Sequence, residues 1–258
     1  MRRAALSVLA LVATSALAAC GGSGGGSSDG SSNGSSKATI APVAYVKSAA
    51  RKTAGVTSEH VALKGSAALN GQAVIVTGDG DFAQHSGSMH FDFNAGGLSG
   101  TIDATLDGTD LYLRSPLFTA ALPPGKTWLK IDLTKVANAN GVDLSTLISQ
   151  DPSQTLARLR SISNVKELGT EQVGGVATTH YRGRVTKAAT APAGVYDVWI
   201  GTDDSFVHRM KVASVIGPRQ HVVTTVDLSD FGKTVTVDVP PASETYDATN
   251  LKIPGLTS

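Results

Sequence analysis

Hydrophobic and polar residues alternate along most of the chain after residue 55, as they do in β-strands that bury one face. Turn residues separate the alternating segments, and Asp107-Gly108 is typical of a two-residue hairpin turn. The pattern predicts an antiparallel meander with one apolar and one solvated face. We predict strands at 60–64, 73–77, 88–93, 98–106, 109–114, 129–133, 165–172, 177–186, 195–200, 206–216, 221–228 and 235–239.

Three segments depart from this alternation and indicate helices. Pro42 suits a first helical turn, and the apolar residues that follow it recur with near-helical spacing, so we expect a helix to open the folded body. In the middle of the chain, 143–150 and 151–161 are predicted to form two short helices. Asp151-Pro152 would start the second of them, with an N-cap residue followed by proline.

This order of elements predicts an α+β domain. Three short helices are too few to cover a sheet of about ten strands if the sheet is flat, so the sheet must curl over them or close on itself. A curled sheet would leave an apolar cavity between its concave face and the helices.

Six apolar residues of the first meander are our candidates for lining such a cavity. Burial of acyl chains against them would be favourable by about 25 cal/mol per Å². The same side chains would also suit a packed core, and the alternation does not distinguish a lined cavity from a filled interior. The candidates are Phe91, Phe93, Ile102, Leu106, Leu111 and Leu113.

The start of the chain has the pattern of a secretory signal. Arg2 and Arg3 precede an uncharged, mostly apolar stretch, and small residues precede Cys20. The apolar stretch is shorter than the roughly 20 residues that span a bilayer. We expect a signal peptide over 1–19 that is removed from the mature protein.

The ending Leu17-Ala18-Ala19-Cys20 resembles the bacterial lipobox, and Cys20 is the only cysteine of the chain. The resemblance implies cleavage before Cys20 and a diacylglyceryl group on its thiol. Several acyl chains, at about 0.8 kcal/mol per buried CH₂, give a stable anchor in a membrane. The alternative is an ordinary secreted protein with a chance cysteine at the cleavage site.

The segment that follows differs from the rest in composition. Residues 20–36 are almost entirely Gly and Ser after the cysteine, so they have no apolar surface to bury and are expected to form a flexible tether. The folded domain is then predicted over 37–258. We expect it to lie at the outer face of the cell membrane, held there by its lipid anchor.

Composition argues against several classes of function. Without Arg2 and Arg3 the chain has 20 basic residues, from 22 minus 2, against 21 acidic ones. This balance argues against a nucleic-acid partner and against electrostatic docking on anionic lipid. The six histidines are scattered without the spacing of a metal site, so we expect no metal and no cofactor.

Two short segments match catalytic motifs in their letters but lack the secondary structure or the companion motifs that those sites require. Ser163-Asn164-Val165-Lys166 spells Ser-x-x-Lys but begins a predicted strand. Asp230-Phe231-Gly232 lacks the glycine loop and catalytic loop of a kinase. We therefore expect no enzyme and name no catalytic residue. A hydrolase would require a Ser, a His and an Asp that meet in space without any motif.

Several segments resemble a known group of proteins: Gly125-Lys126-Thr127-Trp128-Leu129-Lys130-Ile131-Asp132, Asp197-Val198-Trp199-Ile200-Gly201 and Leu228-Ser229-Asp230-Phe231-Gly232. In this order of elements they are similar to the actinobacterial LppX/LprG-type lipoproteins, which share a fold with the periplasmic carriers LolA and LolB. The resemblance covers most of 43–241. It implies a strongly curved antiparallel sheet, a half-barrel with a few short helices over its concave face, and a cavity that holds acyl chains.

Two hypotheses about function follow. The first is a membrane-anchored lipoprotein that binds and transports the acyl chains of a lipid or glycolipid. The second is an interaction module that binds another envelope protein and has no lipid ligand. A large apolar cavity favours the carrier, whereas a packed core with an exposed apolar patch favours the module.

Overall fold

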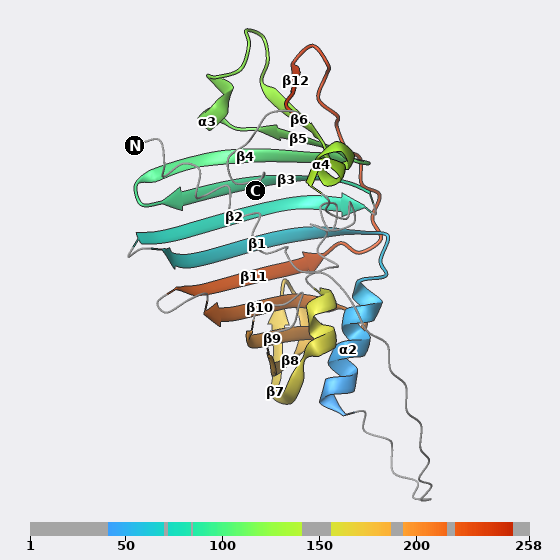
Figure 1. Cartoon of the computed structure of the whole chain (residues 1–258). Coiled ribbons are helices and arrows are strands. Elements are labelled where there is room, and N and C mark those ends of the chain that lie inside the picture. The colour runs from blue at the N-terminus through green and yellow to red at the C-terminus, as the bar shows by residue number, and fades with distance from the viewer. Residues whose placement is uncertain are drawn as a thin grey trace, which may run out of the picture.

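The computed structural model describes residues 41–69, 72–83, 85–140, 156–186, 193–215 and 220–249. Cys20, the predicted signal and tether, and the predicted helix 143–150 lie outside the described residues. Within these segments the chain forms one large open sheet with a few short helices (Figure 1). None of the described helices is long and apolar enough to cross a membrane.

The sheet is built from two meanders that lie side by side. Its strand order is β12-β6-β5-β4-β3-β2-β1-β11-β10-β9-β8-β7. The first meander consists of β1 (Ser58–Leu69), β2 (Gln72–Ala83), β3 (Ser86–Ala95), β4 (Leu98–Asp107), β5 (Asp110–Arg114) and β6 (Trp128–Asp132). The second consists of β7 (Ser163–Val173), β8 (Val176–Val185), β9 (Gly194–Gly201), β10 (Val207–Val215) and β11 (His221–Ser229).

Strand β1 joins the two meanders because it pairs with β2 on one side and with β11 on the other. Val61, for example, lies between Gly80 and Leu228. The chain therefore leaves the sheet at β6, near one edge, and re-enters it at β7, the opposite edge. Helix α4 (Leu133–Asn140) directly follows β6, and the 3₁₀ helix η2 (Arg158–Ser161) lies just before β7.

The sheet curves strongly. In Figure 1 the long strands β1 to β4 lie broadside to the viewer, whereas β8 and β9 are foreshortened and lie to the left of α2 (Pro42–Thr53). The predicted fold class is confirmed: an α+β half-barrel, with a curved antiparallel sheet and few short helices. Among the described strands, the one parallel pair joins β6 to the short edge strand β12 (Thr245–Asp247).

Helix α2 begins at the predicted proline and packs over the second meander. Its buried residues Val46, Ala49 and Ala50 belong to one apolar cluster with Leu159 of η2 and with residues of β8 to β11. At its end, the Thr53 hydroxyl oxygen accepts a hydrogen bond from the Val207 backbone N–H at 2.8 Å. The predicted buried positions of the second inserted helix, Leu156 and Leu159, are also confirmed, at 1% and 0% exposure.

Two predictions at strand ends are wrong. Val235, Val237 and Val239 alternate but form no strand, because both sides of β11 are already paired, with β1 and β10, and no neighbouring edge is left for another hairpin. Leu133 starts α4 instead of continuing β6. Asp132 ends that strand, since its side chain accepts a hydrogen bond from the Lys135 backbone N–H at 3.1 Å, as a helix N-cap does.

Replacement of Leu159 by alanine tests the packing of η2 under α2. Because Leu159 is fully buried, we expect Leu159→Ala to lower the free energy of unfolding by about 2–5 kcal/mol. The matched control is Leu168→Ala on β7, where the side chain is 49% exposed and the change should stay within about 0.5 kcal/mol. Urea unfolding measures both, and equal losses would contradict this account of the core.

Candidate functional site

The inward side of the sheet, which faces α2 and η2, is largely apolar, and we call it the concave face. Directly paired residues of neighbouring strands point to the same side of a sheet. Phe91 on β3 is paired with Ile102 on β4 and with Gly78 on β2. Through successive pairs, the same row continues across the sheet to Leu63, Val226, Met210, Val198 and Tyr181.

All six residues nominated from the sequence lie on the concave face of β3, β4 and β5. Phe91 is paired with Ile102, and Leu106 with Leu111. Phe93 and Ile102 are buried, whereas Phe91, Leu106, Leu111 and Leu113 are half-buried. The first meander thus brings the six together on one surface. That they line a lipid site stays a prediction.

The two halves of the concave face differ in what packs on them. Over the second meander, α2 and η2 pack on the strands and form one large apolar cluster with them. Tyr181 of β8 belongs to this cluster, and burial raises the pKa of its hydroxyl group to about 12. The large cluster also includes Val61 and Met89 of the first meander. Farther along the first meander, strand residues form a second cluster, to which no described helix residue belongs and which meets the first at Leu63 and Phe91. It comprises Ala67, Val74, Val76, Phe93 and Ile102, with Leu63, Phe91, Ala95, Leu98, Leu113 and Val222 packed against it. We call this second cluster the strand floor.

Glycines on neighbouring strands give the floor its shape. A Cβ atom at Gly78 would lie 2.7 Å from Cδ1 of Phe91, and one at Gly100 would lie 2.9 Å from Cζ of Phe93. Each ring therefore lies over a glycine of the adjacent strand and covers its backbone, a cross-strand arrangement that compensates for a missing side chain. The phenyl rings can lie this close to the neighbouring strands because Gly78 and Gly100 have no Cβ atom.

The opposite, convex face carries charge pairs between strands. Arg209 donates to both carboxylate oxygens of Asp227, at 2.5 and 2.6 Å. His90 is hydrogen-bonded to Asp103 at 2.6 Å, and this bond raises the pKa of His90. Among the described strands, the cross-strand charge pairs therefore lie on the convex face and most of the clustered apolar side chains on the concave face.

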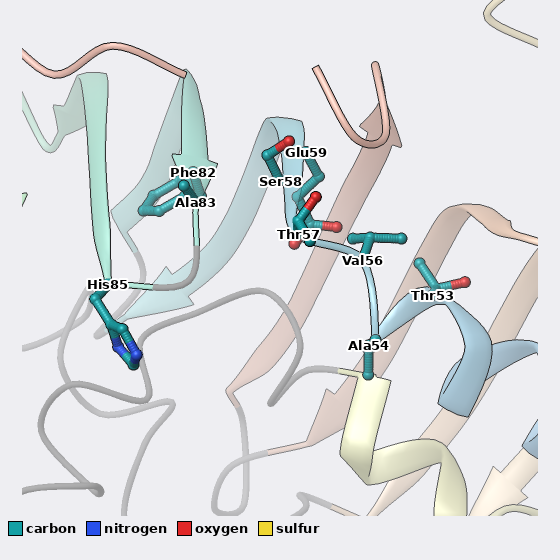
Figure 2. A pocket seen from close by; sticks show the side chains of 10 residues that line it. Thr53, Ala54, Val56, Thr57, Ser58, Glu59, Phe82, Ala83 and His85 are labelled. Atoms are coloured by element: carbon teal, nitrogen blue, oxygen red, sulfur yellow. The ribbon is translucent and has the colours of Figure 1, made fainter. Parts of the chain in front are cut away.

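Two hollows border the concave face. The first, of about 500 Å³, lies beside α3 (Pro116–Thr119) and is lined by Phe118, Ala121, Leu122, Pro123, Leu129 and Tyr246. Leu129 is paired with Leu113, so this hollow adjoins the nominated residues. The second, of about 210 Å³, lies where α2 joins β1 (Figure 2).

Sequence reasoning missed both hollows. Pro116 after Ser115 offered a helix-start signal for α3, since the Ser115 side chain caps that helix. No signal in the chain pointed to the space beside it.

The motif-like segments have structural roles. The Ser163 hydroxyl donates to the Arg184 carbonyl oxygen at 3.1 Å, and Asp230 pairs with Lys233 at 2.5 Å. Phe231 packs against Phe206, with ring centroids 4.7 Å apart. In the described part of the chain, no three His, Cys, Asp or Glu side chains are placed to hold a metal ion.

Comparison with known proteins places this architecture among bacterial lipoprotein folds. No model of a protein family matches the chain. An uncharacterized 31.2 kDa protein encoded between rplA and rplJ in Streptomyces griseus is 28% identical over 248 residues, which cover 80% of this chain and 79% of that protein. The Streptomyces coelicolor protein SCO4650, named as a candidate lipoprotein, is 28% identical over 127 residues, 48% of this chain and 43% of its own.

Among solved structures, LprF from Mycobacterium bovis aligns over 77% of this chain and 96% of its own, at a TM-score of 0.51 and 16% identity. The lipoprotein LppX from Mycobacterium tuberculosis aligns over 76% and 97%, at a TM-score of 0.49 and 18% identity. The likeness to LprF shows a shared fold. At the level of the fold, it confirms the resemblance to the LppX/LprG-type lipoproteins.

Substitution of Gly78 tests the contact between glycine and ring. Gly78→Ala would push against Phe91 and also against the His90 carbonyl oxygen, 2.8 Å from the new Cβ, so we expect a loss of about 1–3 kcal/mol in unfolding free energy. Gly65→Ala on the same face is the control, because its Cβ would meet nothing closer than 3.9 Å. Urea denaturation compares the two, and equal stability would refute the close contact.

Proposed function

We propose that this protein is a membrane-anchored extracytoplasmic lipoprotein that binds the acyl chains of a lipid or glycolipid and carries them within the envelope. The observation that supports this most directly is the strand floor, an apolar cluster over β1 to β4 that has no described helix residue among its members. The shared fold with LprF fits this proposal, and so does the naming of the relative SCO4650 as a candidate lipoprotein.

Acyl chains suit this surface because their binding needs apolar area and no particular polar partner. Each fully buried CH₂ contributes about 0.8 kcal/mol, so ten methylenes buried on all sides would give roughly 8 kcal/mol before the cost of ordering the chain, and ten laid against one surface would give less. The adjoining hollow at Leu129, about 500 Å³ in volume, lies within the size range of ligand pockets.

Lipidation of Cys20 would hold the domain close to its source of lipid. The Gly/Ser segment 20–36 gives a root-mean-square reach on the order of 20–25 Å, so the domain could approach the membrane without lying on it. We propose that the protein is anchored in this way at the outer face of the cell membrane.

A charge placed on the concave face tests acyl binding. In a Cys20→Ser form, which has no anchor of its own, Leu111→Glu should weaken binding of a pyrene-labelled diacyl lipid at least tenfold, because a carboxylate would be desolvated against the chain. Leu111 is half-buried, so the fold should survive, which circular dichroism checks.

The matched control is Ile75→Glu on β2, which points to the convex face and is 46% exposed. Its affinity should equal that of the parent protein. Equal loss in both variants, or in neither, would contradict binding on the concave face. A parent protein that binds no lipid would favour the envelope interaction module.

A further inference from the structure

The larger hollow lies at the edge of the sheet formed by β6 and β12, beside α3 and the loop that follows it. Figure 1 shows α3, β6 and β12 together at one end of the sheet, with α2 at the other. The volume of about 500 Å³ is within the range of roughly 300–1,000 Å³ that is typical of ligand pockets. Two residues of the sheet and four of α3 and its loop line the hollow: Leu129 and Tyr246, and Phe118, Ala121, Leu122 and Pro123.

One row of the concave face leads directly into this hollow. Successive pairs from β3 to β12 make up the row: Met89, Ala104, Leu113, Leu129 and Tyr246. Its first member, Met89, belongs to the large apolar cluster that includes residues of α2, and Leu113 packs against the strand floor. The hollow therefore continues the apolar surface on which we place the acyl chains.

The chain from α3 to β6 forms the outer wall of the hollow, and contacts at both of its ends fix it. The Cγ atom of Leu117 lies 3.8 Å from the position of a Cβ atom at Gly100, so α3 rests on the concave side of β4. Near the start of β6, the Lys126 ammonium group donates to the carbonyl oxygens of Ala242 and Ser243, at 3.0 and 2.9 Å. The hollow is thus built into the fold before any ligand enters.

The lining of the hollow favours a hydrocarbon chain. All six lining residues are uncharged, and the Tyr246 hydroxyl is the one polar side-chain group among them. Water in such a hollow would have few side-chain partners for hydrogen bonds, so apolar groups would displace it favourably. A charged or polyhydroxylated headgroup would leave its own polar groups unpaired there. The end of an acyl chain therefore suits the hollow better than a headgroup.

We propose that the hollow beside α3 receives the terminal part of an acyl chain, and that it determines how long a chain the protein accepts. The inference rests on the acyl-binding function proposed above. In the hollow, the last methylenes of a long chain would be buried as they are in a bilayer, so added length would not oppose transfer from the membrane. If the hollow were filled, each methylene left in water would lower the affinity about fourfold.

Competition between two diacylglycerols that differ in chain length alone tests this inference. Didodecanoyl and dihexadecanoyl glycerol would be offered in equal amounts, in phosphatidylcholine vesicles, to the Cys20→Ser form of the full chain. Mass spectrometry would compare the amounts bound. The parent protein should take up the two lipids in amounts that agree within about twofold. Leu129→Trp, which fills the hollow from the sheet, should favour the shorter chains at least tenfold, because about two exposed methylenes correspond to roughly fifteenfold.

Leu168→Trp on β7 is the matched control, since it makes the same exchange at a position that is 49% exposed and does not line the hollow. It should take up both lipids as the parent does. Uptake of the didodecanoyl lipid at the level of the parent shows that Leu129→Trp is folded.

If Leu129→Trp does not fold, fluorescence quenching locates the chain end instead. Phe118→Trp is a conservative exchange of one aromatic residue of the lining for another, and its emission above that of the parent reports on the hollow. Hexadecanoyl chains brominated at the methyl end should quench this emission at least twofold more than chains brominated beside the ester.

Two kinds of result separate failure of this site from failure of the proposed function. A folded Leu129→Trp variant that still takes up both lipids equally would overturn the chain-end site and leave acyl binding intact. A tenfold preference for the shorter chains in the parent, or equal quenching by the two brominated chains, would do the same. A parent protein that binds neither diacylglycerol, nor the pyrene-labelled diacyl lipid, would overturn the proposed function and this inference with it.

Discussion

The apolar face of the open sheet has to be kept from water, and the arrangement of the described elements follows from this constraint. A sheet with one apolar side is stable only when that side is covered. The second meander meets this need with α2 and η2, whose side chains pack with those of β8 to β11. Over the first meander the corresponding cluster is built from strands. The function we propose depends on this difference.

The charge pairs on the convex face help to fix which side of each strand faces inward. Cross-strand pairs such as Arg209 with Asp227, and Asp103 with His90 and Arg114, lie on the solvated side of the sheet. A slip of one residue in register would move these charges to the concave face, so they help to specify the register that keeps that face apolar. The flat rings of Phe91 and Phe93 over Gly78 and Gly100 depend on the same register.

Much of the first meander could be predicted from the sequence because its strands pair in chain order. Hairpin register then places Phe91, Ile102, Leu106 and Leu111 on one face with no long-range information. The pairing of β1 with β11 could not be predicted in this way, since it joins segments more than 150 residues apart. The alternation through Val235 also predicted a strand that does not form. A strand needs an unpaired neighbouring strand to bond with, and the alternation of a segment does not show whether such a neighbour is available.

The hollow where α2 joins β1 was missed because it is lined by segments from α2, β1 and the end of β2 that meet only in the folded protein. For the same reason, the pattern of the sequence could nominate the residues of the strand floor but not what occupies the space above them.

The central claim is that the protein carries a lipid, and its most direct test is to identify what the exported protein holds. A Cys20→Ser form would be purified from the exported compartment of a related host and analysed by native mass spectrometry with lipid extraction. Our account predicts a diacylated lipid bound in a stoichiometric amount. A protein that is free of lipid, and that remains free when offered host lipids, would contradict it.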